Sequence, residues 1–279
     1  MKASKISLKL FGTHWECPTL KKAGWVTEEF NLDPAETGFV ALHLWNMGDI
    51  NGPDVPENFF VDMGTEECQL ESLRVAENYI KPAIAAARAI GLPIFHVEPK
   101  NIAMKYDSVH NMLEEEDINP PPVSSKPRPP EVNPGWNLAR AERTHGKGYH
   151  QWDGWQKMRI LSTCEAESGD QVILTGAQFD RICRSKDLKN LIYTGFATNM
   201  CILDAAAATR EMLHYGYKIF LIREATLGVE YPDTFPERLM TRCALKYFQQ
   251  GIGDTVGFEQ YVQACKTIAE ANNIRFPLL

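Results

Sequence analysis

Short apolar runs along the chain alternate with stretches whose apolar residues recur at helical spacing. Each run is bounded by glycine, proline, asparagine or charged residues, which is typical of a strand buried in a parallel sheet. In the first run, FVALHL is followed by WNMGDINGP, where asparagine, glycine and proline break the pattern. The runs that predict strands lie at residues 39–44, 92–97, 171–174, 191–195 and 217–222.

Between these runs, the apolar positions repeat every three or four residues, as they do on one face of a helix. In the helix expected over 68–90, Leu73, Ile80 and Ile84 share one face, and Gly91 ends the helix. Further helices are expected at 179–186, 199–215, 236–248 and 258–271. Because strands alternate with helices, we predict a parallel sheet with helices on both faces.

Two segments do not follow this alternation. Residues 1–36 have few periodic signals and are interpreted as an N-terminal arm. Residues 99–165 form an insertion, and the stretch from 119 to 135 within it holds seven prolines, which neither a helix nor a sheet interior tolerates. We expect this insertion to act as a lid, a subunit arm or a loop. With no internal repeat, residues 1–279 are predicted to form one domain.

Composition narrows the class of protein. The 279 residues are 44% hydrophobic and 23% charged, which is ordinary for a globular chain with a sizeable core. With 29 Lys and Arg against 36 Asp and Glu, the net charge is −7, which argues against a nucleic-acid partner. The acidic run at 114–117 is interpreted as a solvated face rather than a metal site.

The remaining global features indicate a cytoplasmic protein. No stretch of about 18 apolar residues is present, so no membrane span is expected. The N-terminus lacks the sustained apolar region of a signal peptide, so none is expected there. The seven cysteines are widely spaced and include no CxxC pair, which favours free thiols in a reducing compartment over disulfides or a zinc site.

The strand at 191–195 leads into a cysteine that could carry chemistry. Cys201 falls in the first turn of the helix that follows, and Thr198 or Asn199 could cap that helix. The positive end of a helix favours the thiolate form of a cysteine. The backbone N–H groups there can also bind the oxyanion that forms when a carbonyl is attacked. The alternative is a small buried cysteine that only packs.

The residues around Cys201 resemble those of a known family. GFATNMC followed by ILDAAAATREMLHYGY is similar to the isochorismatase-like cysteine hydrolases, the nicotinamidase-related amidohydrolases, which have a Gly-x-x-Thr-x-x-Cys turn before an alanine-rich helix. In the first strand these proteins read Asp, then Gln-Asn two and three residues on. Here LHLWN places His43, Trp45 and Asn46 at those positions. The resemblance covers roughly residues 37–98 and 170–272.

The resemblance implies a fold and a chemistry. The fold would be a three-layer α/β/α sandwich with a six-stranded parallel sheet, usually in an oligomer such as a dimer or tetramer. The family mostly hydrolyses small amides and related C–N bonds with a triad of Cys, Asp and Lys and no cofactor. A cis peptide would join Phe196 to Ala197, and the N–H groups of Ala197 and Cys201 would form the oxyanion hole. Trp45, Asn46, Phe196 and Thr198 would then be the substrate-binding candidates.

This chain departs from the family pattern at two triad positions. His43 stands where the family has the base Asp, and the stretch that should carry the Lys, GDQVILTGAQFD, has none. Lys157 and Lys186 are the nearest lysines before Cys201, and Lys186 lies at the wrong end of its helix. Lys157 could reach the site only if the insertion folds over it. An isochorismate-type vinyl ether cleavage, which depends on the Asp, is disfavoured.

Two interpretations of these departures stay open. In one, His43 deprotonates Cys201 and later protonates the leaving amine, as in other cysteine hydrolases. In the other, the scaffold has lost its chemistry and binds a small ligand or serves in assembly. The first predicts that the His43 ring lies within hydrogen-bond reach of the Cys201 sulfur, directly or through one water, and holds it as a thiolate.

Other candidate residues carry weaker signals. His96 is expected near the end of its strand, close to the edge of the site. Glu224 falls where many family members have an Asp-Ala pair and is expected to organise a turn. No Asp-x-His pair is present, so no metal is expected. The last candidates cluster in the insertion and could line a pocket or pack a surface arm: His145, His150, Trp152 and Trp155.

Overall fold

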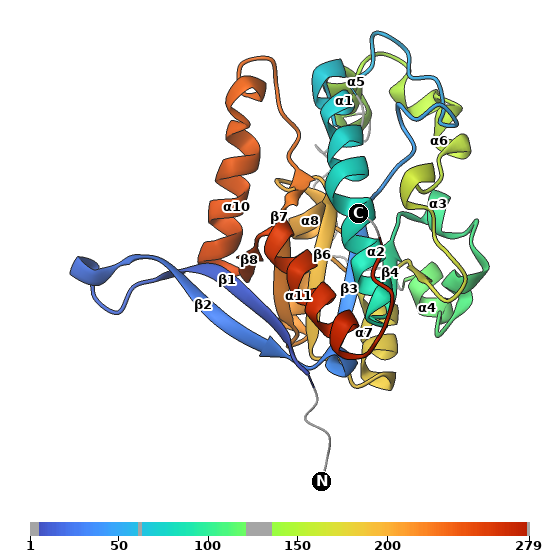
Figure 1. Cartoon of the computed structure of the whole chain (residues 1–279). Helices are drawn as coiled ribbons and strands as arrows, with labels where there is room; N and C mark the ends of the chain where they lie inside the picture. The colour runs from blue at the N-terminus through green and yellow to red at the C-terminus, as the bar shows by residue number, and fades with distance from the viewer. Residues whose placement is uncertain (1–5, 61–62, 121–135, 278–279) are drawn as a thin grey trace.

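The computed structural model, which describes residues 6–60, 63–120 and 136–277, is built around one eight-stranded sheet (Figure 1). The strand order is β2-β1-β8-β7-β6-β3-β4-β5. The six strands from β8 to β5 are all parallel, which confirms the predicted core. The parallel strands are β3 (Thr37–Leu42), β4 (Ile94–Val97), β5 (Gln171–Ile173), β6 (Asn190–Phe196), β7 (Lys218–Leu227) and β8 (Asp254–Val256).

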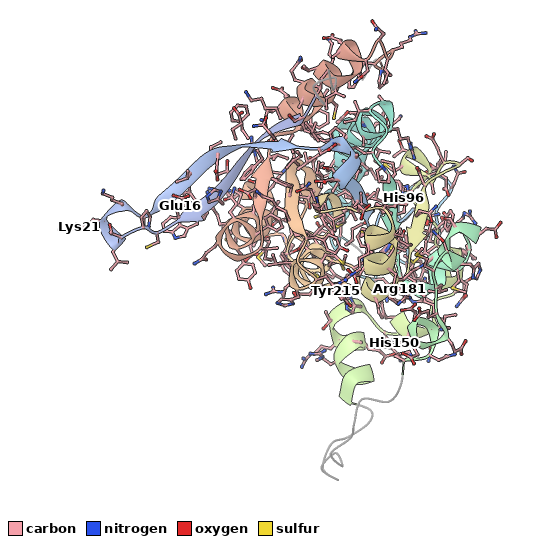
Figure 2. The ribbon with its side chains drawn as sticks, turned by 90° about the horizontal axis from the view of Figure 1, so that it is seen from below. Glu16, Lys21, His96, His150, Arg181 and Tyr215 are labelled. Carbon is pink, nitrogen blue, oxygen red and sulfur yellow. The ribbon has the colours of Figure 1, made fainter. Side chains whose placement is uncertain are left out.

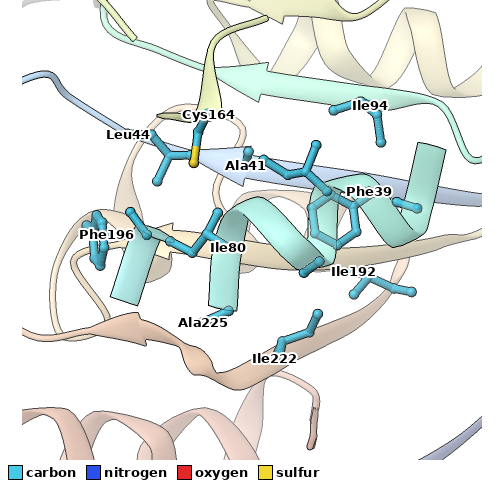
Figure 3. Close-up of a cluster of buried hydrophobic side chains, with 14 of the residues drawn as sticks. Phe39, Ala41, Leu44, Ile80, Ile94, Cys164, Ile192, Phe196, Ile222 and Ala225 are labelled. Carbon is cyan, nitrogen blue, oxygen red and sulfur yellow. The ribbon is translucent and has the colours of Figure 1, made fainter. Parts of the chain in front are cut away.

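Helices cover both faces of this sheet and give the three layers expected. One buried cluster joins the sheet to α1 (Glu66–Val75), α2 (Lys81–Ala89) and α11 (Phe258–Ala271). A second cluster joins the other face to α7 (Gly176–Ser185), α8 (Cys201–Asp204), α9 (Thr209–His214) and α10 (Leu239–Gly251). Figure 3 shows part of the first cluster, which includes Ile80 together with Phe39 of β3 and Ile192 of β6.

The helix predicted over 68–90 is confirmed, with one irregular turn. α1 and α2 are joined by a π-helical turn over Ala76–Ile80, so the chain is helical from Glu66 to Ala89. The Thr65 side chain accepts a hydrogen bond from the Cys68 N–H at 3.3 Å and caps the start. Gly91 follows the end with φ +77°, a conformation that glycine adopts at little cost.

The N-terminal arm is a β-hairpin, which the sequence did not predict. Strands β1 (Leu8–Glu16) and β2 (Gly24–Leu32) pair antiparallel, and Thr13 of β1 pairs with Thr255 of β8. The hairpin thereby extends the parallel sheet by two strands and projects well beyond the rest of the molecule, with Glu16 and Lys21 at its far end (Figure 2).

The prediction of one alanine-rich helix over 199–215 is wrong, because the chain leaves the helical path between α8 and α9. Ala207 has φ +57°, which interrupts the helix. Two side chains hold it there: the buried Tyr193 hydroxyl of β6 donates to the Ala207 carbonyl at 2.8 Å, and the nearby Glu211 carboxylate accepts the Ala207 N–H at 2.7 Å. These bonds satisfy backbone groups that a continuous helix would have paired internally.

The insertion packs beside the end of the sheet formed by β4 and β5 (Figure 1). Its helices are α3 (Lys100–Ala103), α4 (Glu115–Ile118), α5 (Trp136–His145) and α6 (Gly154–Lys157). Most of the proline-rich stretch, residues 121–135, lies outside the described residues. Trp152 and Trp155 pack against the main core. None of the helices in the described part of the chain is long and apolar enough to cross a bilayer.

Candidate functional site

The two strands that carry the candidate chemistry are neighbours at the centre of the sheet, as predicted. β3 and β6 pair in parallel from Thr37 opposite Asn190 to Leu42 opposite Gly195. His43 directly follows β3, and the turn to Cys201 directly follows β6. Because the carboxyl ends of parallel strands meet at one edge, both residues leave the sheet at the edge where α/β proteins bind ligands.

The two strand ends approach each other closely. Gly195 has φ +116°, and a Cβ atom on this residue would lie 2.0 Å from the Leu42 carbonyl oxygen. Only glycine fits this close backbone contact. At the residue after Leu42, the His43 N–H donates to the Val97 carbonyl of β4 at 2.9 Å. The end of β3 is therefore held by β4 on one side and by β6 on the other.

The turn before Cys201 has the conformation expected from the resemblance. The Phe196–Ala197 peptide bond is cis, which confirms the prediction. The Ala197 carbonyl accepts the N–H groups of Met200 at 3.0 Å and Ile202 at 3.1 Å, which closes the turn. The Thr198 N–H donates to the Leu227 carbonyl at 3.0 Å, and this bond ties the turn to β7.

The prediction that Thr198 or Asn199 caps the Cys201 helix is wrong. Met200 stands at the cap position and makes no side-chain cap bond. The Asn199 side chain instead accepts the Val229 N–H at 2.9 Å and donates to the Val229 carbonyl at 3.2 Å. The buried Thr198 hydroxyl bonds to the Thr226 hydroxyl at 2.6 Å, so it is committed within the protein rather than open to a substrate.

Cys201 is the first residue of α8, as expected, but this helix has only four residues. The N–H groups of Ile202, Leu203 and Asp204 already donate to carbonyls of the preceding turn at 3.0 to 3.1 Å. A short helix whose first N–H groups are bonded supports a thiolate less than the long helix that the sequence predicted. The surroundings of His43 therefore matter more for the reactivity of Cys201.

His43 is a buried and conformationally unusual residue. Its backbone has φ +51°, which is uncommon outside glycine. Burial lowers the pKa of the imidazole to about 4, so the ring is neutral near pH 7. Its Nδ1 atom is buried without a hydrogen-bond partner among the described residues. A neutral ring can accept the thiol proton, whereas the predicted resting ion pair with a Cys201 thiolate is disfavoured.

Trp45 and Asn46 lie in the loop after His43 and have different surroundings. The Trp45 ring stacks on the His43 ring, with 5.1 Å between centroids and 30° between planes. The Asn46 side chain is buried and accepts the Arg159 N–H at 2.8 Å, so it joins this loop to the insertion. Asn46 therefore has a structural role, and Trp45 stays a candidate for substrate contact together with the nearly buried Phe196.

Glu98 is a site residue that sequence reasoning missed. It follows β4 directly and is only 1% exposed. Its carboxylate accepts the Leu44 N–H and the Trp45 indole N–H, each at 3.1 Å. The available signal was an acidic residue placed immediately after the apolar run LPIFHV, at the edge of the sheet where ligands bind.

Lys157 and Glu224 both have identifiable partners. The Lys157 side chain is 63% exposed, and its ammonium lies 2.7 Å from the Asp153 carboxylate. Nothing in these contacts assigns it the role of the family Lys. The Glu224 carboxylate accepts the Phe258 N–H at 2.8 Å at the start of α11. Glu224 therefore organises the chain, as predicted.

The other histidines have structural surroundings. His96 is fully buried, and its Nε2 lies 3.2 Å from the Asp170 carboxylate, which also accepts from Arg88. His145 Nδ1 lies 2.7 Å from the Phe60 carbonyl, and its ring stacks on Tyr149. His150 is exposed, whereas the rings of Trp152 and Trp155 pack edge to face with 4.9 Å between centroids. No group of potential metal ligands forms within the described ranges.

We predict that Cys201 is the most reactive of the seven thiols towards iodoacetamide. Burial raises the pKa of Cys164 and Cys265 to about 12 and also raises that of Cys183, while Cys68 is buried. Cys201 is partly exposed and follows β6, whose neighbour β3 leads to His43. Limited labelling followed by peptide mapping checks this order. Faster labelling of Cys17 or Cys243, which are more exposed, would show that exposure alone sets reactivity.

Comparisons with known proteins agree with this fold. No family model matches the chain. The ureidoacrylate amidohydrolase RutB of Azorhizobium caulinodans is 27% identical over 113 residues, which cover 36% of this chain and 48% of that protein. The matched stretch thus spans about half the length of the curated relative.

Solved structures extend the likeness over most of the chain. A cysteine hydrolase from Pseudomonas syringae superposes with a TM-score of 0.52 at 14% identity, covering 85% of this chain and 95% of that one. An isochorismatase family protein from Burkholderia thailandensis gives a TM-score of 0.45 at 18% identity, covering 83% and 96%. The chain therefore has the isochorismatase-like fold that its sequence predicted, with the hairpin added at one edge.

Proposed function

We propose that this protein is a cysteine hydrolase that cleaves a small amide or a related C–N bond through an acyl-enzyme on Cys201. The observation that carries the proposal is the convergence of Cys201 and His43 at the ends of adjacent central strands. The cis peptide at Phe196–Ala197 adds the turn that the resemblance requires. The amidohydrolase named among the relatives supports the choice of C–N bonds.

In the proposed first step, the Cys201 sulfur attacks the amide carbonyl carbon while the neutral His43 takes the thiol proton. The N–H groups of Ala197 and Cys201 stabilise the negative oxygen of the tetrahedral intermediate. The C–N bond breaks, and His43 passes the proton to the leaving amine, so a thioester remains on Cys201. Water then attacks the thioester and gives one proton to His43, which returns it to the sulfur as the carboxylic acid leaves.

An experiment on the intact chain tests this function. A panel of primary amides and ureido acids is incubated with the protein, with amine or ammonia release and intact mass as readouts. We expect release for at least one class and a transient mass increase equal to the acyl group, mapped to Cys201. Release of amine without any adduct on Cys201, even under rapid acid quench, would contradict the acyl-enzyme.

The alternative is a non-catalytic member of the same fold that binds a small ligand or serves in assembly. The absence of a lysine at the family position and the pairing of Lys157 with Asp153 favour it. A protein that binds members of the panel in calorimetry, yet neither releases amine nor forms an adduct, would support this alternative over the hydrolase.

The proposal includes a single domain over residues 1–279 that acts as a homo-oligomer, a dimer or tetramer. The sheet takes strands from both ends of the chain, which supports one domain. The projecting hairpin leaves Leu20 92% exposed and Phe11 and Trp25 about two-fifths exposed, which is costly unless another copy covers them. We expect a mass above that of one chain in light scattering, and a monomer after Leu20→Asp and Trp25→Asp are combined.

A further inference from the structure

A buried carboxylate lies where β3 and β4 separate. The β3–β4 ladder ends with the bond from His43 N–H to the Val97 carbonyl, after which the two chains diverge. Glu98 is the residue directly after β4, and its N–H donates to the Ile173 carbonyl of β5 at 3.0 Å. Its side chain lies beside Leu44, whose N–H it accepts. A carboxylate buried there is stabilised by the hydrogen bonds that it accepts.

The two oxygens of Glu98 hold the segment after His43 at two points. One accepts the Leu44 N–H, which has no β4 carbonyl to bond, and the other accepts the indole N–H of Trp45. The indole is thereby fixed at one end, and its face stacks on the His43 ring. Because the buried His43 Nδ1 has no hydrogen-bond partner among the described residues, that nitrogen does not orient the ring.

We propose that Glu98 is a positioning residue, which acts through the Trp45 indole to hold the His43 imidazole in the orientation that serves Cys201. This inference rests on the proposed hydrolase function. It adds a carboxyl group that is not part of the family triad, at a site where the usual Asp and Lys are missing. Orientation matters because a misplacement of about 1 Å can slow a reaction by about a hundredfold.

The backbone of the loop has supports that do not depend on Glu98. The Leu44 carbonyl accepts the Leu161 N–H at 2.7 Å, and the Asn46 N–H donates to the Arg159 carbonyl at 3.1 Å. These bonds join the loop to the insertion and do not involve Glu98. A conservative change at Glu98 should therefore disturb the indole and the ring stacked on it more than the course of the chain.

The test measures the alkylation rate of Cys201 against pH in four variants of the full chain. His43→Ala is the reference, because it removes the base. Glu98→Gln places an amide N–H against one of the two donors, and Trp45→Phe keeps a stacking ring but loses the indole N–H. We expect each of these two changes to slow alkylation at pH 7 by about tenfold. In the double variant the second change should add little, because both act on one contact.

The matched control is Asp170→Asn, which weakens another buried contact between a carboxylate and a β4 histidine, at the opposite end of β5. It should lower the unfolding temperature and leave the alkylation profile of Cys201 as in the wild type. The proposal is overturned if Glu98→Gln retains the wild-type rate and profile while His43→Ala is slow. If His43→Ala itself retains the wild-type rate, the proposed hydrolase function fails instead.

Discussion

Replacing Cys201 with alanine should reduce amide hydrolysis by at least about a thousandfold and remove the acyl adduct. The sulfur is the only protein atom in the proposed mechanism that forms a covalent bond to the substrate, and loss of a nucleophile in comparable hydrolases costs several orders of magnitude. Cys201 is partly exposed and begins a four-residue helix, so alanine should leave the folded structure intact. Steady-state amine release on a substrate identified from the panel measures the loss.

Cys243→Ala is the matched control for this experiment, because Cys243 is an exposed cysteine on α10. It should retain wild-type turnover, and both variants should unfold near the wild-type temperature. Turnover that persists in Cys201→Ala within tenfold of the wild type would exclude the covalent route. A water molecule activated by His43 would then be the simpler nucleophile.

The sequence predicted the part of the fold that depends on local pattern. Five of the six parallel strands follow from the apolar runs, because burial on both faces makes such strands continuous apolar runs, whereas the six-stranded sheet itself came from the family resemblance. The helix over 199–215 failed for a different reason. Alanine favours a helix locally, but the Tyr193 hydroxyl and the Glu211 carboxylate hold Ala207 in another conformation. Side-chain contacts with the backbone such as these leave no periodic signal in the sequence.

The candidate site, like the fold, was predictable only where contiguous residues determine it. The resemblance of GFATNMC to the family turn predicted both the cis bond and the place of Cys201, because the matching residues are contiguous. Glu98 was missed because an acidic residue after a strand usually faces water. Its burial is decided by where β3 leaves β4, which the sequence does not show. The same holds for His43, whose neutral state depends on the burial of its ring.

The free energy of unfolding should fall as pH drops from 7.5 to 4, and His43 should contribute about 3 kcal/mol of that fall. An exposed histidine in the unfolded chain has a pKa of 6.5, and burial lowers the pKa of His43 to about 4. Between these values the unfolded chain binds a proton that the folded protein excludes. Stability from this residue is therefore complete above pH 6.5 and is lost as pH falls to 4. Urea unfolding at several pH values measures it.

Carboxylates such as Asp170, whose pKa is also lowered in the folded state, add to the loss of stability at low pH, so the contribution of His43 must be isolated. His43→Gln keeps a polar, neutral side chain of similar length that takes up no proton in this range. We expect its free energy of unfolding to decline by about 3 kcal/mol less than that of the wild type between pH 7.5 and 4. Equal declines in the two proteins would mean that His43 takes up its proton without unfolding. In that case the ring is open to water, and the resting ion pair with Cys201 becomes the better description of the site.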